Sequence, residues 1–314
     1  MIYYGIIGLG SQGMKIKNLI SREYKDIKTD VIIKNSSSVI SNDQLVELSL
    51  KYDGIIISSP AHTHVEYLQA LNNYKGKILC EKPPAINRQD LDKLSNMDLN
   101  NVMFCLNLKY GILGNILDDC LRGKYGNLTH IDIKVSHGFA YKSNYKESWR
   151  TKYKYNPTGI GASLAIHFVD LLISKLSEPV YSDIHYTNNS NNGEVPDTAL
   201  YNFVFNRRIT SSLYCSYANP FSTTVDIYLD DNIISYNGRS ITIKGPRDVF
   251  DADGCYCSPT TIKQTSITLD KLWNESFKTM LSNFISVNIE DSSFKYDSVT
   301  SLVSNKYILK NVDL

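Results

Sequence analysis

The sequence predicts two domains, an N-terminal α/β domain with a doubly wound parallel sheet and a C-terminal α+β domain rich in antiparallel strands. Three observations lead to this prediction: a length of 314 residues, short apolar runs that alternate with helix-like segments at the start of the chain, and longer alternating stretches after about residue 120. Because the chain is longer than one compact core usually is, we expect a division into residues 1–118 and 119–314.

Five apolar runs in the first domain are typical of buried parallel strands. Parallel strands that are covered on both faces read as continuous apolar stretches, and the segments between these runs place apolar residues at helical spacing. The expected strands are residues 2–7, 31–33, 54–58, 77–80 and 102–106, and the expected helices are residues 12–20, 43–50, 63–71 and 90–94. This alternation is the pattern of βαβ units.

The second domain has a different texture, with stretches rich in Tyr, Thr, Ile and Val that favour antiparallel strands. A polar stretch, TNNSNNGE at residues 187–194, predicts an exposed loop. The expected strands are residues 129–135, 183–186, 199–205, 209–217 and 224–229, and the expected helices are residues 163–176, 269–287 and 296–309.

Composition narrows the classes of partner. With 33 Lys and Arg against 32 Asp and Glu, the formal net charge is only +1, so the chain lacks the basic excess that binds nucleic acid or an anionic membrane. No apolar run approaches the length of a membrane span, and the first ten residues do not resemble a signal peptide. We therefore expect a small-molecule partner, with no nucleic acid and no membrane.

The six cysteines predict free thiols and a cytoplasmic location. Four of them lie in apolar stretches, where free cysteine behaves as a small hydrophobic residue. Cys255 and Cys257 are separated by one residue, which is shorter than the spacing of common zinc sites, and the chain has no matching second pair. We expect no metal site.

A glycine-rich motif, GLGSQG at residues 8–13, follows the first expected strand and opens the first expected helix. Glycines in this pattern permit a tight turn, let the main chain approach a pyrophosphate, and allow the helix to lie close to the strand. The context predicts nucleotide binding by Gly8, Gly10, Ser11, Gln12 and Gly13.

The end of the second expected strand bears on the choice of nicotinamide cofactor. An acidic residue there bonds the ribose 2′-hydroxyl and repels a 2′-phosphate. Lys34, Asn35 and Ser36 offer a cation, an amide and a hydroxyl but no carboxylate, which favours NADP over NAD. The alternative is a solvated loop in which Asn35 or Ser36 holds an NAD ribose.

A second motif, CEKPP at residues 80–84, stands where the fourth expected strand ends. Ligands of doubly wound sheets bind at this carboxyl edge. A lysine beside a rigid proline turn can be held against a bound nicotinamide and exchange a proton with a substrate hydroxyl. Lys82 is therefore a candidate catalytic residue.

Four ordered segments together resemble one known family. They are GLGSQG at 8–13, SSPAHTHVEYLQAL at 58–71, GKILCEKPPA at 76–85, and Trp149-Arg150 followed by GIGASLAIHFVD at 159–170. Together they are similar to the glucose-fructose oxidoreductase, inositol dehydrogenase and rhizopine-catabolism family (Gfo/Idh/MocA). The resemblance implies a Rossmann domain followed by a domain on a large, open, mostly antiparallel sheet, whose exposed face would form a homodimer or homotetramer.

The resemblance also implies roles for individual residues. It places Lys82 in contact with both substrate and cofactor, and it favours an active-site role for His167, which by its own pattern would be a buried helix histidine. The residues implied on the cofactor side are Ser59, Pro60, His64 and Glu81, and those on the substrate side are Trp149, Arg150, Ser163 and Asp170.

Ser163 departs from the family pattern, which normally has an aspartate at this position. A carboxylate four residues before a histidine shares a helix face with it and can hold a substrate hydroxyl or a proton. Ser163 can still hydrogen-bond a sugar, but proton transfer would then rest on His167 and Lys82. Lys109 stands where the family often has an arginine.

These observations predict an NAD(P)-dependent oxidoreductase that transfers a hydride between nicotinamide and a hydroxyl or ketone carbon of a sugar, polyol or nucleotide-linked sugar. One alternative is a non-catalytic sensor that binds a dinucleotide or sugar through the same fold, because fold does not fix function. A second alternative is a lyase or glycosidase that uses a transient oxidation and retains its cofactor.

Overall fold

The computed structural model describes residues 1–33, 42–206, 209–245, 250–288 and 292–311. The chain forms two compact units. Unit 1 comprises residues 1–106, 153–158 and 280–309, and unit 2 comprises residues 107–152 and 159–279 and the end of the chain from Lys310. The units are interleaved along the chain, whereas the sequence predicted one division after residue 118.

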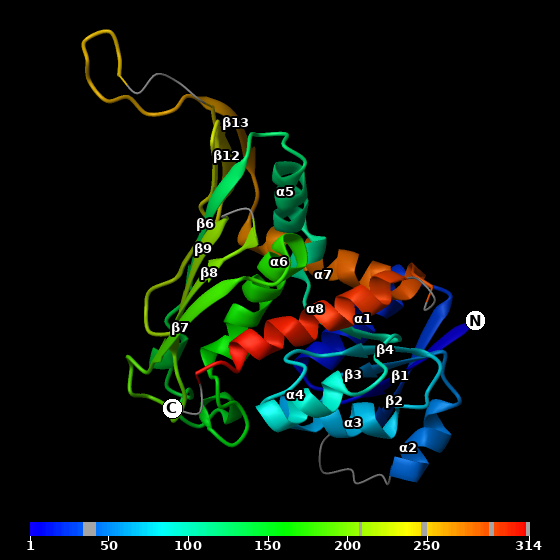
Figure 1. Ribbon diagram of the computed structural model, residues 1–314. Coiled ribbons are helices and arrows are strands. Elements are labelled where there is room, and N and C mark those ends of the chain that lie inside the picture. Colours follow the sequence, from blue (N-terminus) through cyan, green and yellow to red (C-terminus); the bar gives the residue numbers. More distant parts are fainter. Residues whose placement is uncertain (34–41, 207–208, 246–249, 289–291, 312–314) are drawn as a thin grey trace. The chain divides into compact units, whose positions relative to one another are not determined.

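Unit 1 is built on a parallel sheet of five strands in the order β2-β1-β3-β4-β5 (Figure 1). The strands are β1 (Ile2–Ile7), β2 (Ile27–Ile33), β3 (Gly54–Ile57), β4 (Lys77–Cys80) and β5 (Val102–Phe104). The order reverses between β1 and β3, whose last residues, Ile7 and Ile57, are paired. In a sheet of this kind a ligand binds outside the carboxyl ends of the strands where the order reverses.

Each predicted strand of the first domain is present. Strand β2 begins four residues earlier than the sequence indicated, because it lies at the edge of the sheet and alternates between buried and exposed side chains. Only its last three residues form a continuous apolar run. The helices of this unit are α1 (Ser11–Glu23), α2 (Asn42–Ser49), α3 (His64–Ala70), α4 (Arg88–Ser95) and α8 (Ser292–Ile308).

Unit 2 contains an eight-stranded sheet in the order β13-β12-β11-β10-β6-β9-β8-β7. All neighbouring pairs are antiparallel except β6 and β9. The strands are β6 (Leu128–Ser136), β7 (Tyr181–Thr187), β8 (Thr198–Val204), β9 (Thr210–Ser216), β10 (Ser222–Leu229), β11 (Ile233–Tyr236), β12 (Ser240–Lys244) and β13 (Thr261–Ser266). The fold is thus the Rossmann-like domain and large open sheet that the sequence predicted.

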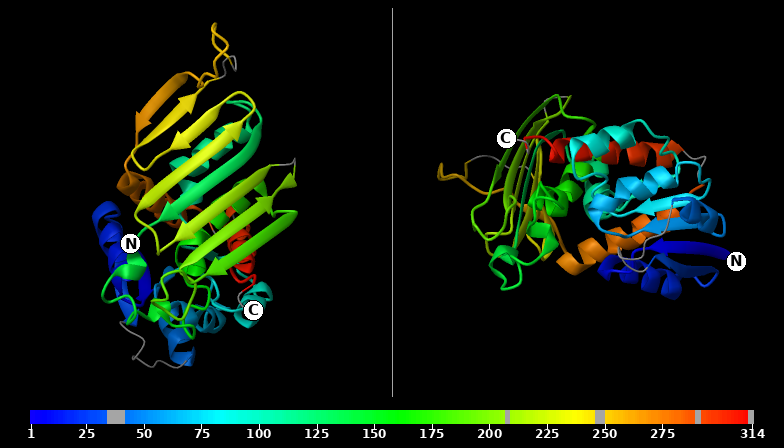
Figure 2. Two further views of the ribbon diagram at one scale, coloured as in Figure 1. Left: turned by 90° about the vertical axis from the view of Figure 1, so that its left-hand side faces the viewer. Right: turned by 90° about the horizontal axis from the view of Figure 1, so that it is seen from below.

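The sequence did not predict three strands of this sheet. Strands β11 and β12 are short, and every residue of β13 is exposed, so none of them shows a long apolar alternation. One face of the sheet carries no α-helix of the described residues, as Figure 2 shows in its left view. Assembly into a homodimer or homotetramer through this face stays a prediction.

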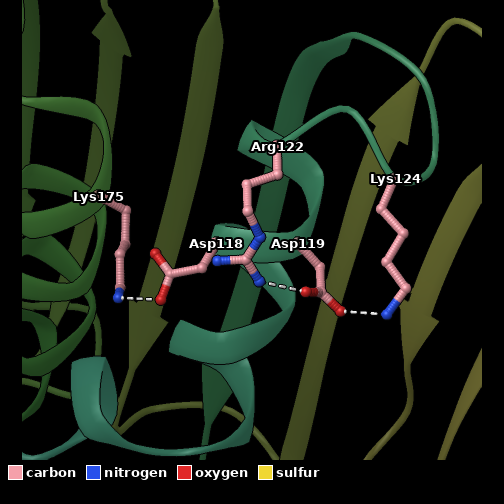
Figure 3. Close-up of polar contacts among 5 residues, drawn as sticks. All are labelled: Asp118, Asp119, Arg122, Lys124 and Lys175. Carbon is pink, nitrogen blue, oxygen red and sulfur yellow. Dashed lines mark hydrogen bonds and ion pairs between the residues drawn. The ribbon is translucent and has the colours of Figure 1, made fainter.

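The helices of unit 2 include α5 (Ile112–Leu121) and α6 (Ile166–Leu176), and α7 (Leu269–Ser286) begins there and ends in unit 1. A π-helical turn, Gly161–Ala165, leads directly into α6. Lys175 of α6 pairs with Asp118 of α5 at 2.6 Å, while Asp119 pairs with Arg122 and Lys124 (Figure 3). The sequence reading did not expect α5, and its domain boundary at residue 118 falls inside this helix.

No helix within the described ranges is both long and apolar enough to cross a membrane.

Candidate functional site

The glycine turn of unit 1 joins β1 to α1, and its glycines meet different surroundings. A Cβ at Gly13 would lie 2.2 Å from the carbonyl oxygen of Gly8, so only glycine lets α1 approach the strand this closely. Gly8 itself has φ +89°, which other residues rarely adopt. A Cβ at Gly10, by contrast, would meet no atom of the described residues within 4 Å. Two glycines therefore serve packing, and the third faces open space.

The N-terminus of α1 suits an anion. Among the described residues no side chain caps this helix, and its first turn carries no acidic residue. Ser11 and Gln12 are exposed at its start. Because the first amides of a helix lack carbonyl partners and carry partial positive charge, a phosphate group is stabilised there. The open turn at Gly10, Ser11 and Gln12, called the glycine cradle below, fits the pyrophosphate of a dinucleotide.

The loop after β3 lies against the same turn. A Cβ on Gly8 would stand 2.6 Å from the carbonyl of Ser58 and 2.7 Å from the amide nitrogen of Ser59. The Thr63 hydroxyl donates to the Pro60 carbonyl at 2.8 Å and lies within hydrogen-bond distance of the Ser59 hydroxyl at 2.7 Å, which fixes the loop. Ser59, predicted on the cofactor side, thus stands next to the glycine turn, and Pro60 follows it in the same loop.

We expect Gly10→Ala to leave stability within about 1 kcal/mol of the wild type. It should weaken NADH and NADPH binding at least about tenfold, because the added methyl group takes the space that a pyrophosphate needs. The matched variant Gly13→Ala should instead destabilise the protein through its 2.2 Å clash with Gly8. Fluorescence titration with each coenzyme and thermal unfolding separate the two effects. Wild-type affinity in Gly10→Ala would show that this turn does not hold the pyrophosphate.

Three residues predicted to hold the ribose, Lys34, Asn35 and Ser36, lie outside the described residues. The last described residue before them, Ile33, ends β2 beside the glycine turn, and its carbonyl accepts a hydrogen bond from Gly8 N–H at 2.7 Å.

The turn that carries Lys82 is anchored on both sides. Glu81 is buried, and its carboxylate accepts the Lys82 amide at 3.2 Å. The Ala85 amide donates to Oδ1 of Asn305, a buried residue of α8, at 2.8 Å. Pro83 between them is also buried, whereas Lys82 is half-buried. The backbone of Lys82 is therefore fixed at the carboxyl edge of the sheet, and the residue stays partly exposed.

His64 connects this turn to the loop after β3. The ring is fully buried, with Nδ1 2.9 Å from the Pro83 carbonyl oxygen and Nε2 3.0 Å from the Ser59 carbonyl oxygen. Burial lowers the pKa of His64, although both carbonyl contacts act in the opposite direction. A neutral ring donates one of these two hydrogen bonds. Because no part of the ring is exposed, we expect His64 to act on the cofactor through the two loops it braces.

Glu81 is predicted on the cofactor side and lies in a buried polar environment. Burial raises the pKa of its carboxyl, while the Lys82 charge, the Lys82 amide and a hydrogen bond with the Cys105 thiol oppose this shift. The carboxyl and its neighbours hold the start of the Lys82 turn in place.

In unit 2 the two candidate residues of the helix at 161–176 have different neighbours. The His167 ring meets the Trp273 ring edge-on, with centroids 5.2 Å apart and planes at 87°. The Ser163 hydroxyl is hydrogen-bonded to the hydroxyl of Tyr217, the residue that follows β9. The sequence placed both residues on one face of a regular helix, but Ser163 lies in the π-helical turn, which changes the spacing of side chains.

Asp170 forms a buried ion pair with Lys109, at 3.1 Å. Their side chains are 1% and 7% exposed. Lys109 lies in a 3-10 turn, Leu108–Tyr110, so the pair joins this turn to α6. Substrate binding by Asp170 stays a prediction, and the burial of its side chain favours a role in positioning the helix that carries His167.

Trp149 and Arg150 open a 3-10 turn, Trp149–Thr151, and both are exposed. The Arg150 guanidinium stacks over the Trp149 ring at 4.6 Å, and the Ser148 hydroxyl accepts the Arg150 amide at 3.3 Å. Burial raises the pKa of the Tyr217 hydroxyl, and the hydrogen bond with Ser163 and the charge of Arg150 act in the opposite direction.

Sequence reasoning missed three residues that shape these sites: Asn305, Tyr217 and Trp273. None belongs to a motif that the sequence reading used. The Lys109–Asp170 pair could have been predicted from the sequence, because each charged residue interrupts an apolar run and buried charges are normally paired.

Comparison with known proteins identifies related domains in both halves of the chain. Residues 2–100 match the family described as "Oxidoreductase family, NAD-binding Rossmann fold", and residues 120–235 match "GFO/IDH/MocA C-terminal domain". Together the two matches cover more than half of the chain.

One curated relative is a glucose-6-phosphate 3-dehydrogenase from Bacillus subtilis (strain 168), 29% identical over 136 residues. The alignment covers 41% of this chain and 37% of that protein, so the match spans well under two thirds of either.

Two solved structures share the fold over nearly the whole chain. An oxidoreductase from Thermotoga maritima has a TM-score of 0.77 at 14% identity, covering 99% of this chain and 95% of that chain. A levoglucosan dehydrogenase in complex with NADH and levoglucosan has a TM-score of 0.75 at 14% identity, covering 97% and 95%. At these identities the similarity demonstrates the fold.

Proposed function

Because the chain belongs to the GFO/IDH/MocA family of oxidoreductases, with an NAD-binding Rossmann domain at its N-terminus, we propose that it is an NAD(P)-dependent dehydrogenase or reductase acting on a CH–OH group. The substrate would be a sugar, polyol or nucleotide-linked sugar. The observation that carries the proposal is the anchored Lys82 turn, which stands at the carboxyl edge of the same sheet as the open glycine cradle.

Different residues of the chain would bind the coenzyme and transfer the proton. Gly10, Ser11 and Gln12 would hold the pyrophosphate, and the loop at Ser59 and Pro60 would border the nucleotide. Bound nicotinamide supplies the hydride acceptor or donor. When the substrate carbon loses its hydride, the hydroxyl proton passes to a base, and Lys82 and His167 are the groups that would take it. In the reverse direction the same groups return the proton to the ketone oxygen.

The preferred coenzyme is NADP(H) in this proposal. Residues 34–38, after β2, contain one cation and no carboxylate, so nothing in this stretch repels a 2′-phosphate.

A sugar-like substrate is supported by two relatives. Glucose-6-phosphate 3-dehydrogenase and levoglucosan dehydrogenase, as their names state, oxidise sugars. On the substrate side, the half-buried hydroxyl of Ser163 and the exposed aromatic and guanidinium groups of Trp149 and Arg150 are the kinds of group that bind such molecules.

We expect saturable binding of NADPH, and weaker binding of NADH, when protein fluorescence is titrated with each coenzyme. An absorbance screen of sugars, sugar phosphates and nucleotide sugars in both directions should then show coenzyme turnover. Failure of both coenzymes to bind would contradict the proposal. Binding without turnover across the whole panel would instead support the second candidate.

That second candidate is a non-catalytic sensor with the same fold. The observation that favours it is Ser163, which stands where the family pattern has an acidic residue and whose hydroxyl is bonded to Tyr217. A serine cannot hold negative charge near neutral pH. A sensor that binds a sugar without oxidising it has no need of the acidic residue that the family pattern has at this position.

A further inference from the structure

The helix α8 buries polar side chains in unit 1. It packs against β5 and α4, and a helix in such a position normally buries an apolar face. Six polar residues of α8 are buried instead: Asp297, Ser298, Thr300, Ser301, Ser304 and Asn305. Because burial of a polar group costs free energy unless the group is hydrogen-bonded, the hydrogen bonds of these side chains indicate why they are there.

Asn305 differs from the serines of this face in the reach of its hydrogen bond. The Ser298 and Ser304 hydroxyls donate to carbonyl groups one turn earlier in their own helix. Oδ1 of Asn305 instead accepts the Ala85 N–H at 2.8 Å, and both residues are fully buried. Asn305 therefore connects α8 to the turn that follows β4.

This turn, residues 81–85, has few main-chain donors that can hold its shape. It reads Glu-Lys-Pro-Pro-Ala, and neither proline has an N–H. The Glu81 N–H donates to a carbonyl of β3 at 2.8 Å, and the Lys82 N–H donates to the Glu81 side chain within the turn. The Ala85 N–H is the remaining donor. Its hydrogen bond to Asn305 fixes the far end of the turn to another element.

The nitrogen of the Asn305 side chain indicates that stability alone does not explain this residue. Nδ2 is buried and has no hydrogen-bond partner among the described residues. An unsatisfied buried donor costs free energy, and this cost offsets part of what the hydrogen bond to Ala85 contributes. A leucine of similar shape would remove the cost together with the bond. The amide is therefore better explained by what its oxygen holds in place.

We propose that Asn305 is a positioning residue for Lys82: it fixes the Ala85 end of the turn to α8 and so sets where the lysine amine stands at the carboxyl edge of the sheet. This inference rests on the proposed function in that it concerns the proton transfer assigned to Lys82. A general acid or base must stand within hydrogen-bond distance of the proton that it transfers. A displacement of about 1 Å can lower the rate by about 100-fold, even when its cause lies far from the reacting atoms.

Asn305→Leu removes the oxygen acceptor and keeps a similar side-chain shape. We expect it to lower kcat by about 100-fold, while KM and coenzyme affinity stay close to the wild-type values. Because the unsatisfied Nδ2 is lost together with the bond to Ala85, Tm should change by less than about 4 °C. Asn305→Asp keeps an oxygen acceptor in the same place and should recover most of the lost kcat.

Asn101→Leu is the matched control, because Asn101 also holds main-chain groups of unit 1. Its Nδ2 donates to the Tyr74 carbonyl at 2.9 Å and to the Gly76 carbonyl at 2.8 Å, at the opposite end of β4 from Lys82. Since both hydrogen bonds are lost in the variant, Asn101→Leu should lower Tm more than Asn305→Leu does, while kcat stays at the wild-type value. A purely structural role for Asn305 would not produce this crossed pattern.

Two further measurements report on the turn without requiring turnover. One is the rate of amide hydrogen exchange at Ala85, and the other is the rate at which acetic anhydride acetylates Lys82, followed by mass spectrometry of peptides. Both rates should rise about tenfold in Asn305→Leu, the usual effect of losing one buried hydrogen bond. Neither rate should change in Asn101→Leu.

Wild-type kcat in Asn305→Leu, or a loss of kcat that Asn101→Leu matches, would overturn the inference and leave the proposed function standing. If no substrate in the screen is turned over, the proposed function fails, and the acetylation rate of Lys82 then decides the inference. An unchanged rate in Asn305→Leu would overturn it, and a faster rate would support it.

Discussion

Lys82→Ala should lower kcat with any substrate found in the screen by about 100- to 10,000-fold, the range that a positioned general acid or base contributes. Coenzyme affinity should stay close to the wild-type value, because Ile33, Thr63 and His64 form hydrogen bonds that hold the glycine turn and the Ser59 loop. The backbone of the turn should also be retained, since Glu81, His64 and Asn305 bind its main-chain groups. Steady-state kinetics and coenzyme titration measure the two effects.

Lys93→Ala is the control for that experiment. Lys93 lies on α4 in the same unit, is exposed, and pairs with Asp90 at 2.8 Å, a contact of little energetic weight. Its loss should change neither kcat nor coenzyme affinity. Wild-type turnover in Lys82→Ala would remove the lysine from the chemistry, and joint loss of turnover and coenzyme binding would assign it to the cofactor site alone.

The second large effect is expected in stability. Removing one partner of the Lys109–Asp170 pair leaves the other charge buried, so Lys109→Met and Asp170→Leu should each lower the free energy of unfolding of unit 2 by about 3 to 5 kcal/mol. The pair joins the Leu108–Tyr110 turn to α6, and its loss should loosen the helix that begins beside His167. Thermal and denaturant unfolding measure the change.

The double variant Lys109→Met/Asp170→Leu distinguishes charge burial from packing. With both charges gone the desolvation cost disappears, so the double variant should be more stable than either single variant. Lys175→Met, which breaks the half-exposed pair with Asp118 in Figure 3, should cost no more than about 1 kcal/mol. Additive losses in the double variant would mean that the two side chains stabilise the protein independently of each other.

The sequence by itself determined the parts of this protein that depend on local pattern. Strands β1 and β4 were located to the residue, because buried parallel strands are continuous apolar runs. The glycine turn was recognised because the need for a positive φ and for absent side chains is recorded in the residue type itself. Lys82 was singled out because its motif ends a strand, and the ends of parallel strands share one edge of the sheet.

Only the tertiary structure decided which groups meet across long stretches of chain. The Asn305 amide oxygen holds Ala85 from 220 residues away, and Lys109 pairs with Asp170. The Ser163 hydroxyl is hydrogen-bonded to Tyr217, and Ser163 lies in a π-helical turn that the apolar spacing of the sequence did not predict. Strands β11 and β12 are too short for their apolar alternation to be recognised, and the exposed strand β13 forms through hydrogen bonds to β12. Local pattern specifies what a segment can become, whereas partner, burial and charge environment depend on residues that the chain brings together only by folding.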